Sequence, residues 1–391
     1  MISVTKLLLA KEYQGDELRY RKGAAHMKHG TSEGHGPVVA WNMTRTCNLR
    51  CRHCYMDADA KKHAGELSTE EAKKFIDDLA AFRVPALLMS GGEPLMREDF
   101  FELAAYASEH GVRPTLSTNG TLIDEDAAKK IKAAGVAYVG VSLDGPQHVN
   151  DVFRGKEGAY GAAMRGIQNC VAVGQRVGLR FTINKANVDH LDEIFDFIEQ
   201  ENIDRACFYH LVYAGRGEAM ADEDVTPAES RRAMDTIIRR TRDYEAHGLE
   251  KEILTVDNHC DGVYLYLTAK RDGDKSLATR IWHLISMNGG NRSGIAFGEV
   301  DPEGNVHPDQ FTQYYTFGNV RERSFGEIWR DESNPVLAGL KNRKPLLKGR
   351  CAKCRYLDQC NGNFRTRAEA RTGDYWESDP ACYLTDEEIG L

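Results

Sequence analysis

The sequence has no long apolar run, no excess of positive charge and no internal repeat, and each absence removes a class of protein. No segment approaches the roughly 20 consecutive apolar residues that a membrane-spanning helix needs. Its 51 basic residues are outnumbered by 59 acidic ones, and the net charge of −8 argues against a general nucleic-acid-binding surface. The apolar stretch Leu7–Ala10 is too short for the core of a signal peptide, so we expect a cytoplasmic protein.

Length and composition predict a folded protein of more than one domain. Single hydrophobic cores stop growing near roughly 250 to 300 residues, and this chain has 391. Hydrophobic residues make up 41% and charged residues 28%, which is a globular composition. We therefore expect one large barrel-type domain with a smaller appendage.

Between residues 38 and 215, β-rich runs alternate with amphipathic helical stretches, a pattern typical of parallel strands joined by crossover helices. Ser68 and Glu71 form a capping box at the start of one expected helix. The expected strands begin at Val38, Ala86, Pro114, Tyr138, Gly178 and Cys207. These strand and helix units predict an α/β fold with an incomplete barrel.

The pattern changes on both sides of this region. Residues 1–37 are expected to be an N-terminal extension, and residues 216–292 a connecting helical and irregular segment with a charged helix from about Thr226 to His247. Residues 293–391 consist of short, turn-rich segments with four cysteines, too little apolar sequence for a core without a metal. We expect a cysteine-stabilised C-terminal domain there.

The first group of cysteines, Cys47, Cys51 and Cys54, has C-x3-C-x2-C spacing and follows the first expected strand. In parallel barrels, the loops at the C-terminal ends of strands build the active site. Three thiolates leave one iron of a four-iron cluster without a protein ligand. A closed zinc site needs a fourth ligand, and the spacing of the adjacent His53 is unfavourable for that role.

The second group, Cys351, Cys354, Cys360 and Cys382, supplies four thiols, enough for one fully ligated cluster or a zinc ribbon. The remaining three of the 10 cysteines stand apart. Cys170 and Cys207 occupy apolar periodic positions, where buried and inert thiols are usual. Cys260 follows His259 in DNHCD, and its role is left open.

Three further motifs follow the next expected strands: SGGEP at 90–94, STNGT at 117–121 and SLDG at 142–145. The glycines at 91 and 92 allow close backbone approach, and Glu93 adds negative charge where an ammonium group would bind. The later motifs offer hydroxyl, amide and carboxylate groups. Each motif alone would be an ordinary turn or cap.

Together, the cysteine triplet and SGGEP resemble the signatures of the radical S-adenosylmethionine (SAM) superfamily, whose fold is a partial (β/α)6 barrel of TIM type. The resemblance implies a [4Fe-4S] cluster on Cys47, Cys51 and Cys54 that cleaves SAM to a 5′-deoxyadenosyl radical. The implied SAM-binding residues are Gly91, Gly92, Glu93, Ser117, Asn119, Ser142, Asp144, Arg154, Thr182 and Asn184. For Arg154, Thr182 and Asn184, a surface or packing role stays open.

The second cysteine group resembles the SPASM extension, which carries auxiliary [4Fe-4S] clusters. The complete pattern has another cysteine where Phe364 stands and two more in the region 297–310, where none occurs. All the missing thiols belong to one of the two auxiliary clusters. The resemblance therefore implies two clusters in this chain, the second fully ligated by Cys351, Cys354, Cys360 and Cys382.

Longer segments resemble the tetrapyrrole-modifying SPASM enzymes of alternative haem and haem d1 biosynthesis: PVVAWNMTRTCNLRCRHCY, RFTINKAN, FYHLVYAGRG, LTVDNH and GRCAKCRYLDQC. This resemblance implies removal of two acetate side chains from 12,18-didecarboxysiroheme, giving iron-coproporphyrin III in siroheme-dependent haem b biosynthesis. Action on the propionates of the same substrate, in haem d1 biosynthesis, is the second interpretation. An iron tetrapyrrole and an unidentified low-potential electron donor are the implied partners.

Candidate substrate residues are histidines that could ligate the substrate iron and arginines that could bind its carboxylates. They are His210, His259, His307, Arg45, Arg180 and Arg216. Each of them could instead have a structural role: the histidines could lie in the core or in loops, and the arginines could point away from the barrel. A peptide-modifying SPASM enzyme and a non-catalytic iron–sulfur carrier also remain, although a carrier needs no SAM pocket.

Overall fold

The computed structural model describes all 391 residues and contains one ten-stranded sheet in the order β1-β8-β7-β6-β5-β4-β3-β2-β9-β10. Pairing is parallel from β8 across to β9 and antiparallel only at the two edges. The strands are β1 (Ile2–Ser3), β2 (Val38–Asn42), β3 (Ala86–Ser90), β4 (Arg113–Thr118), β5 (Val139–Ser142), β6 (Val177–Ile183), β7 (Arg205–His210), β8 (Glu252–Val256), β9 (Phe297–Val300) and β10 (Val306–His307).

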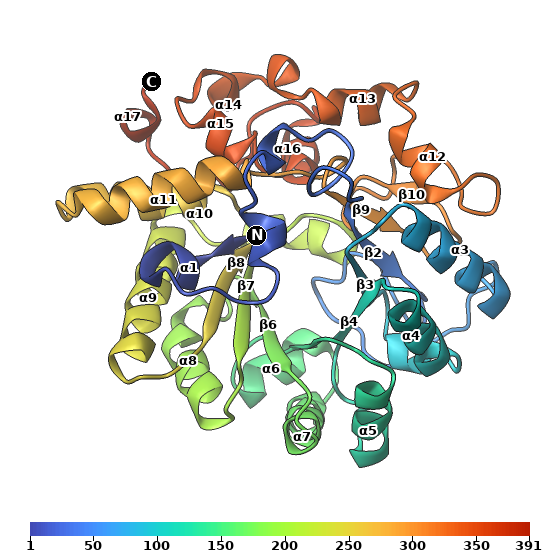
Figure 1. Ribbon diagram of the computed structural model, residues 1–391. Helices are drawn as coiled ribbons and strands as arrows, with labels where there is room; N and C mark the ends of the chain where they lie inside the picture. The colour runs from blue at the N-terminus through green and yellow to red at the C-terminus, as the bar shows by residue number, and fades with distance from the viewer.

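Helices cover the outside of the curved sheet, and α3, α4, α5, α7 and α8 form an arc around it (Figure 1). The helices are α1 (Val4–Leu9), α2 (Asp16–Arg19), α3 (Thr69–Ala81), α4 (Phe100–Glu109), α5 (Glu125–Ala133), α6 (Gln147–Arg154), α7 (Ala159–Ala172), α8 (Leu191–Gln200), α9 (Pro227–Ala246), α10 (Cys260–Arg271), α11 (Lys275–Asn288), α12 (Phe325–Arg330), α13 (Pro335–Lys341), α14 (Gly349–Lys353), α15 (Leu357–Cys360), α16 (Arg365–Thr372) and α17 (Asp386–Ile389). No helix combines the length and apolarity needed to cross a bilayer.

Local sequence signals explain where several helices begin. The expected capping box is present: the Ser68 side chain accepts from the backbone N–H of Glu71, and the Glu71 side chain accepts from the backbone N–H of Ser68. Asp124 caps α5 by accepting from the backbone N–H of Ala127. Asp99 occupies the position before α4 but makes no cap, because its carboxylate binds Arg97 and Thr69.

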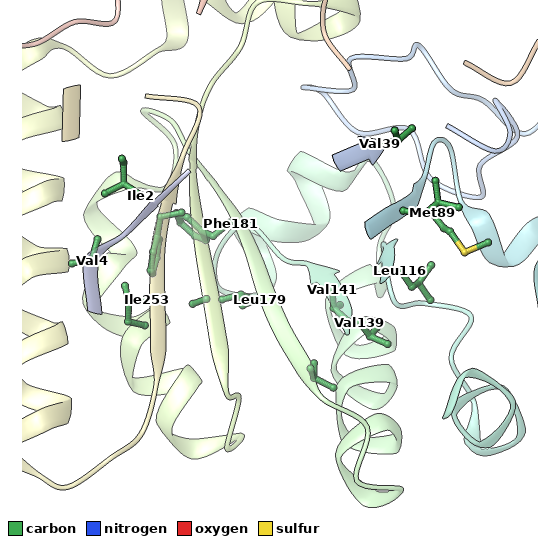
Figure 2. Close-up of a cluster of buried hydrophobic side chains, with 14 of the residues drawn as sticks. Ile2, Val4, Val39, Met89, Leu116, Val139, Val141, Leu179, Phe181 and Ile253 are labelled. Atoms are coloured by element: carbon green, nitrogen blue, oxygen red, sulfur yellow. The ribbon is translucent and has the colours of Figure 1, made fainter. Parts of the chain in front are cut away.

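The six expected strands are all present, and their side chains alternate between two environments. Residues such as Met89, Leu116 and Leu179 point outward into one continuous apolar cluster beneath the helices, shown in Figure 2. The alternate positions point inward and line a cavity. Because successive side chains on a strand point to opposite faces, one set of residues packs under the helices and the alternate set lines the cavity.

Both edges of the barrel come from segments that we expected to lie outside it. β8 lies in the segment expected to be connecting, and β1 of the N-terminal extension pairs with it. β9 pairs in parallel with β2, so the residues after 293 contribute a strand to the same sheet. β8 was not predicted, because a five-residue apolar run, EILTV, does not by itself distinguish a strand from another buried segment.

A buried ion pair attaches the C-terminal region to the barrel. Arg367 and Asp379 have fully buried side chains, and an Arg367 Nη lies 2.7 Å from an Asp379 Oδ. The same guanidinium donates to the backbone carbonyls of Leu211, at 3.1 Å, and Asp257, at 2.6 Å. Arg367 thus connects α16 to the loops that follow β7 and β8.

We predict that Arg367→Met lowers the free energy of unfolding by about 3–5 kcal/mol, because it leaves the Asp379 carboxylate buried without its cation. Anaerobic urea denaturation measures the change. The matched control is Arg371→Met on the same helix, whose partner Asp222 is exposed, and we expect a loss below about 1 kcal/mol. Equal losses in the two variants would contradict the role given to Arg367.

Candidate active site

The first three cysteines lie on the loop that follows β2, and all three thiols are free. They line a cavity of about 430 Å³. The loop is held in place by backbone hydrogen bonds, including one of 2.7 Å from the Cys47 N–H to the carbonyl of Asp59. The structure therefore brings Cys47, Cys51 and Cys54 together at the C-terminal edge of the sheet, as expected.

Hydrogen-bond donors point at the sulfurs of this loop. The backbone N–H of Leu49 lies 3.4 Å from Cys47 Sγ, and Asn119 Nδ2 lies 3.9 Å from the same atom. Arg154 Nη1 lies 3.6 Å from Cys51 Sγ. Burial raises the pKa of Cys47 to about 12, so these donors supply the stabilisation that a thiolate requires. The donor set fits a thiolate-bound iron–sulfur cluster.

The glycines of SGGEP are required by the packing of two loops. Gly91 has a φ of +123°, and an added Cβ there would lie 2.6 Å from the carbonyl oxygen of Thr44. A Cβ at Gly92 would overlap the carbonyl of Thr46. The Gly92 N–H donates to the Thr44 carbonyl at 2.7 Å, which fixes the SGGEP loop against the cysteine loop. Both glycines line the cavity.

Glu93 does not line the cavity, in contrast to the expected role of its charge. Its side chain is fully buried and accepts from the Thr118 hydroxyl at 2.7 Å and from the Asn119 backbone N–H at 2.8 Å. Burial raises the pKa of this carboxyl to about 7, although the hydrogen bonds oppose that shift. Glu93 thus positions the STNGT loop, and Asn119 in particular, beside Cys47.

The remaining candidates for SAM binding divide into two sets. Ser117, Asn119, Ser142, Arg154 and Thr182 line the cavity. Asp144 does not; it is fully buried, forms an ion pair with Arg154 and accepts from the Thr182 N–H at 2.7 Å. Asn184 is also buried, and its side chain bonds to the local backbone. Asp144 and Asn184 therefore act on neighbouring residues from behind the cavity wall.

Two family models match this chain. The model of the radical SAM superfamily matches residues 41–198, which include the first cysteine group, and that of an iron–sulfur cluster-binding domain, SPASM, matches residues 297–355, which include Cys351 and Cys354 of the second group. The fold is similar to that of Streptococcus suis SuiB bound to S-adenosylmethionine, with a TM-score of 0.71, 17% identity, and coverage of 90% of this chain and 78% of that chain.

Similarity to curated relatives extends over the whole chain. It is 55% identical to the Fe-coproporphyrin III synthase of Methanosarcina barkeri, covering 100% of this chain and 99% of the relative. This chain belongs to the radical SAM superfamily. It is also 42% identical to the pre-heme d1 synthase of Dinoroseobacter shibae, covering 90% of this chain and 88% of that protein. It is a radical SAM enzyme whose cofactors are SAM and two iron–sulfur clusters.

The second cysteine group of this radical SAM enzyme surrounds a cavity of about 30 Å³. Cys351, Cys354, Cys360 and Cys382 all line it, and the Tyr356 N–H lies 3.4 Å from Cys354 Sγ. Four thiols around one cavity are the ligand set of a fully ligated four-iron cluster.

The other cysteines lie in three different settings. Cys170 is buried in the apolar core beneath the helices, as expected. Cys207 is buried too, but it faces inward and lines the large cavity rather than the core. Cys260 lines the small cavity beside the four cysteines of the second group. The sequence does not predict this position, because Cys260 is far from that group along the chain and reaches it only through the packing of α10 against α15.

The candidate histidines are not equivalent. His210 and His259 line the large cavity. His210 Nε2 lies 3.0 Å from Asp261 Oδ2; burial opposes protonation, but the charge and hydrogen bond of Asp261 raise the pKa of His210 above its usual value. His307 is outside the cavity, with one ring nitrogen near the Tyr315 carbonyl and the other near Asp301. The structure therefore removes His307 as a substrate ligand.

The candidate arginines also differ. Arg45 binds Glu303 and is absent from the cavity lining, so it no longer qualifies as a substrate residue. Arg216 lines the cavity, but its guanidinium donates to the carbonyls of Cys51, at 2.8 Å, and Ala58, at 3.1 Å. Arg216 therefore stabilises the cysteine loop. Arg180 faces the cavity without a hydrogen bond or an acidic partner.

Several cavity residues were missed by the sequence analysis. Tyr138, Arg205 and Tyr209 line its inner wall, and Phe311 and Phe364 lie together with ring centroids 5.5 Å apart. The sequence does contain a signal for two of them. In RACFYH of β7, the charged and aromatic residues Arg205 and Tyr209 stand at alternate positions, which face the same side of the sheet. No local signal brings Phe311 to Phe364, because the two residues are 53 positions apart in the sequence and their contact is tertiary.

We predict a pH-dependent effect of Glu93→Gln on stability. The folded-state pKa of about 7 exceeds the ordinary value of about 4.3, so the folded protein binds this proton more tightly than the unfolded chain. The stability contributed by Glu93 is therefore present at low pH and is lost as the pH rises through about 7. Relative to wild type, the variant should gain on the order of 2 kcal/mol between about pH 5.5 and pH 8.

Anaerobic urea denaturation at the two pH values measures this difference. The control is Glu70→Gln, which changes an exposed carboxylate on α3. A stability difference that is independent of pH for Glu93→Gln would contradict the raised pKa.

Proposed function

We propose that this chain removes two acetate side chains from 12,18-didecarboxysiroheme, giving iron-coproporphyrin III in siroheme-dependent haem b biosynthesis. The observation that carries this proposal is the full-length similarity to a Fe-coproporphyrin III synthase, which exceeds the similarity to a pre-heme d1 synthase. A haem d1 enzyme acting on the propionates of the same substrate is the alternative. Peptide modification and simple cluster transport have less support, since the relatives that are 55% and 42% identical to the chain carry tetrapyrrole names, whereas the mycofactocin maturases that also match most of it are 30% identical.

Cys47, Cys51 and Cys54 are the proposed ligands of the SAM-binding [4Fe-4S] cluster. Cys351, Cys354, Cys360 and Cys382 are the proposed ligands of the auxiliary [4Fe-4S] cluster. When bound at the first cysteine group, the cluster and SAM, with one electron from a low-potential donor, would supply radical chemistry that removes a hydrogen atom from the substrate. The donor remains part of the proposal, as an unidentified protein partner.

The protein's own contribution is placement and exclusion of water. Gly91 and Gly92 leave the SGGEP backbone open to the cavity, and Ser117, Asn119, Ser142 and Thr182 add polar groups on the following strands and loops. Arg154 is held by Asp144 near Cys51, where its positive charge favours the thiolate. Asn119 and Arg154 are buried and the other groups are partly buried, which limits the access of solvent to the reacting centre.

The cavity suits an anionic ligand in charge. Its volume of about 430 Å³ falls within the range of roughly 300–1,000 Å³ typical of ligand sites. Seven arginines line it, against two acidic residues, Asp257 and Asp309. The seven are Arg19, Arg113, Arg154, Arg180, Arg205, Arg216 and Arg292.

His210 is the better placed of the two remaining histidines to ligate the substrate iron. Its Nε2 is engaged by Asp261, which itself accepts from the Tyr383 hydroxyl at 2.6 Å. Its Nδ1 has no hydrogen bond and is available for a metal, in the arrangement of a carboxylate-oriented histidine ligand. His259 Nε2, in contrast, already lies 3.1 Å from the amino group of Met1.

We predict that Cys47→Ala, Cys51→Ala or Cys54→Ala abolishes formation of 5′-deoxyadenosine under dithionite and leaves about half of the iron bound, because one of two independent sites loses a ligand. Cys382→Ala should lower iron content and stability. Iron analysis and chromatographic detection of 5′-deoxyadenosine measure both effects. Cys170→Ala, a core thiol outside both sites, is the control and should retain iron and cleavage.

The substrate is tested by mass spectrometry of an anaerobic reaction with reconstituted protein, SAM, dithionite and 12,18-didecarboxysiroheme. We expect iron-coproporphyrin III, because loss of two acetates leaves methyl groups at those positions. Change at the propionates would instead indicate the haem d1 branch. Cleavage of SAM without any change in the tetrapyrrole would contradict both.

A further inference from the structure

Two arginines on the inner face of the barrel are arranged as a pair. Arg180 on β6 and Arg205 on β7 both point into the cavity. Strand register places Gly178 opposite Arg205 and Arg180 opposite Cys207, so the two arginines are two residues apart on adjacent strands. Their Cα atoms are therefore roughly 8 Å apart, close enough for both guanidinium groups to reach one ligand.

Each arginine lies over a tyrosine ring that also lines the cavity. Arg180 Cζ is 4.6 Å from the ring centroid of Tyr209, and Arg205 Cζ is 4.7 Å from that of Tyr138. Such stacking holds a guanidinium plane in a fixed orientation while leaving its N–H groups for another partner. Arg180 thus keeps all of its donors for another partner, and Arg205 donates only to the weak acceptor Met1 Sδ, at 3.6 Å.

The negative charge near this pair is too small to neutralise it. Arg180 has no hydrogen bond from its guanidinium and no carboxylate within ion-pair distance. Arg205 Nε lies 3.5 Å from Glu252 but makes no hydrogen bond there. Glu252 already binds Arg19 at 2.7 Å and Arg176 at 2.9 Å. Both arginines are partly buried, and a guanidinium that is shielded from water without a full counter-charge favours an anionic partner, so this wall is complementary to an anion.

Two glycines make the room for these side chains. Gly140 on β5 and Gly178 on β6 have inward parity, where other residues would project a side chain into the cavity. A Cβ at Gly140 would lie 2.9 Å from Arg180 Cδ, and one at Gly178 would overlap the Tyr138 hydroxyl. Glycine inside a strand costs about 0.5–1 kcal/mol relative to alanine, and here it lets Arg180 and Tyr138 lie across the sheet.

The location of the pair determines which carboxylate it would meet. Arg205 is the first residue of β7, whereas the cysteine loop and SGGEP lie at the opposite, C-terminal ends of their strands. A side chain that reacts at the SAM site cannot also reach the start of β7. A carboxylate bound by this pair therefore belongs to a part of the substrate that does not react.

We propose that Arg180 and Arg205 form a carboxylate-binding subsite that takes a propionate side chain of the tetrapyrrole and so directs its acetate side chains toward the SAM site. This inference rests on the proposed function. It specifies how an anionic macrocycle is oriented in a cavity that has several arginines. The two guanidinium groups would supply charge-assisted hydrogen bonds to the carboxylate oxygens.

The first experiment measures anaerobic binding of iron-coproporphyrin III and of its tetra-amide, in which every carboxylate is neutral, by absorbance titration. Wild type should bind the acid more tightly than the amide. Arg180→Gln should bind the acid about 10- to 100-fold more weakly and lose most of the discrimination between the two. Arg180→Lys, which keeps the charge but not the fork of donors, should be intermediate.

The matched control is Arg176→Gln. Arg176 binds the same Glu252 but does not line the cavity, so its loss should leave acid binding and discrimination as in wild type. Iron content and dithionite-driven 5′-deoxyadenosine formation report whether each variant retains its cofactor sites. Should Arg180→Gln fail to retain iron, the comparison of Arg180→Lys with wild type decides the question.

The second experiment compares turnover of 12,18-didecarboxysiroheme by the same proteins. Arg180→Gln should raise KM and release more 5′-deoxyadenosine per product, because a poorly oriented substrate presents the wrong hydrogen. Wild type that neither binds nor converts the tetrapyrrole would overturn the proposed function. Wild type that converts it while Arg180→Gln and Arg180→Lys retain full affinity and discrimination would overturn the carboxylate subsite alone.

Discussion

The parallel direction of the barrel strands is the constraint on which the rest of this structure depends. Because β2 to β7 all run the same way, the loops that follow them leave the sheet at one edge. That edge receives the cysteine loop after β2, SGGEP after β3 and the polar motifs after β4 and β5. A set of residues spread over more than a hundred positions thus faces one cavity.

Contacts between these loops determine which side chains face the cavity and which hold neighbouring residues in position. Glu93 is the clearest case: its carboxylate faces Thr118 and the Asn119 backbone instead of the cavity. Asp144 similarly acts on Arg154, and Arg216 on the carbonyls of the cysteine loop. Acidic and basic groups expected to touch ligands instead fix the positions of the groups that line the cavity.

The C-terminal region completes the barrel as well as holding the second cysteine group. β9 extends the sheet beside β2, and Arg367 joins α16 to the loops after β7 and β8. Asp261, beside the small cavity's Cys260, accepts from both His210 and Tyr383, the residue after Cys382. The wall of the large cavity and the second cysteine group are therefore mechanically connected through buried hydrogen bonds.

The sequence by itself determined the six central strands, the capping box at Ser68 and the two cysteine groups, because hydrophobic period, capping chemistry and ligand spacing are local properties. Only the tertiary structure decided that β8 and β9 join the sheet, that Cys260 lies beside the second group and that His307 and Arg45 lie away from the cavity. It also paired Arg180 with Arg205. These facts depend on strand register and on packing between distant segments. The local sequence around a charged side chain does not indicate whether its partner is a protein group or a ligand.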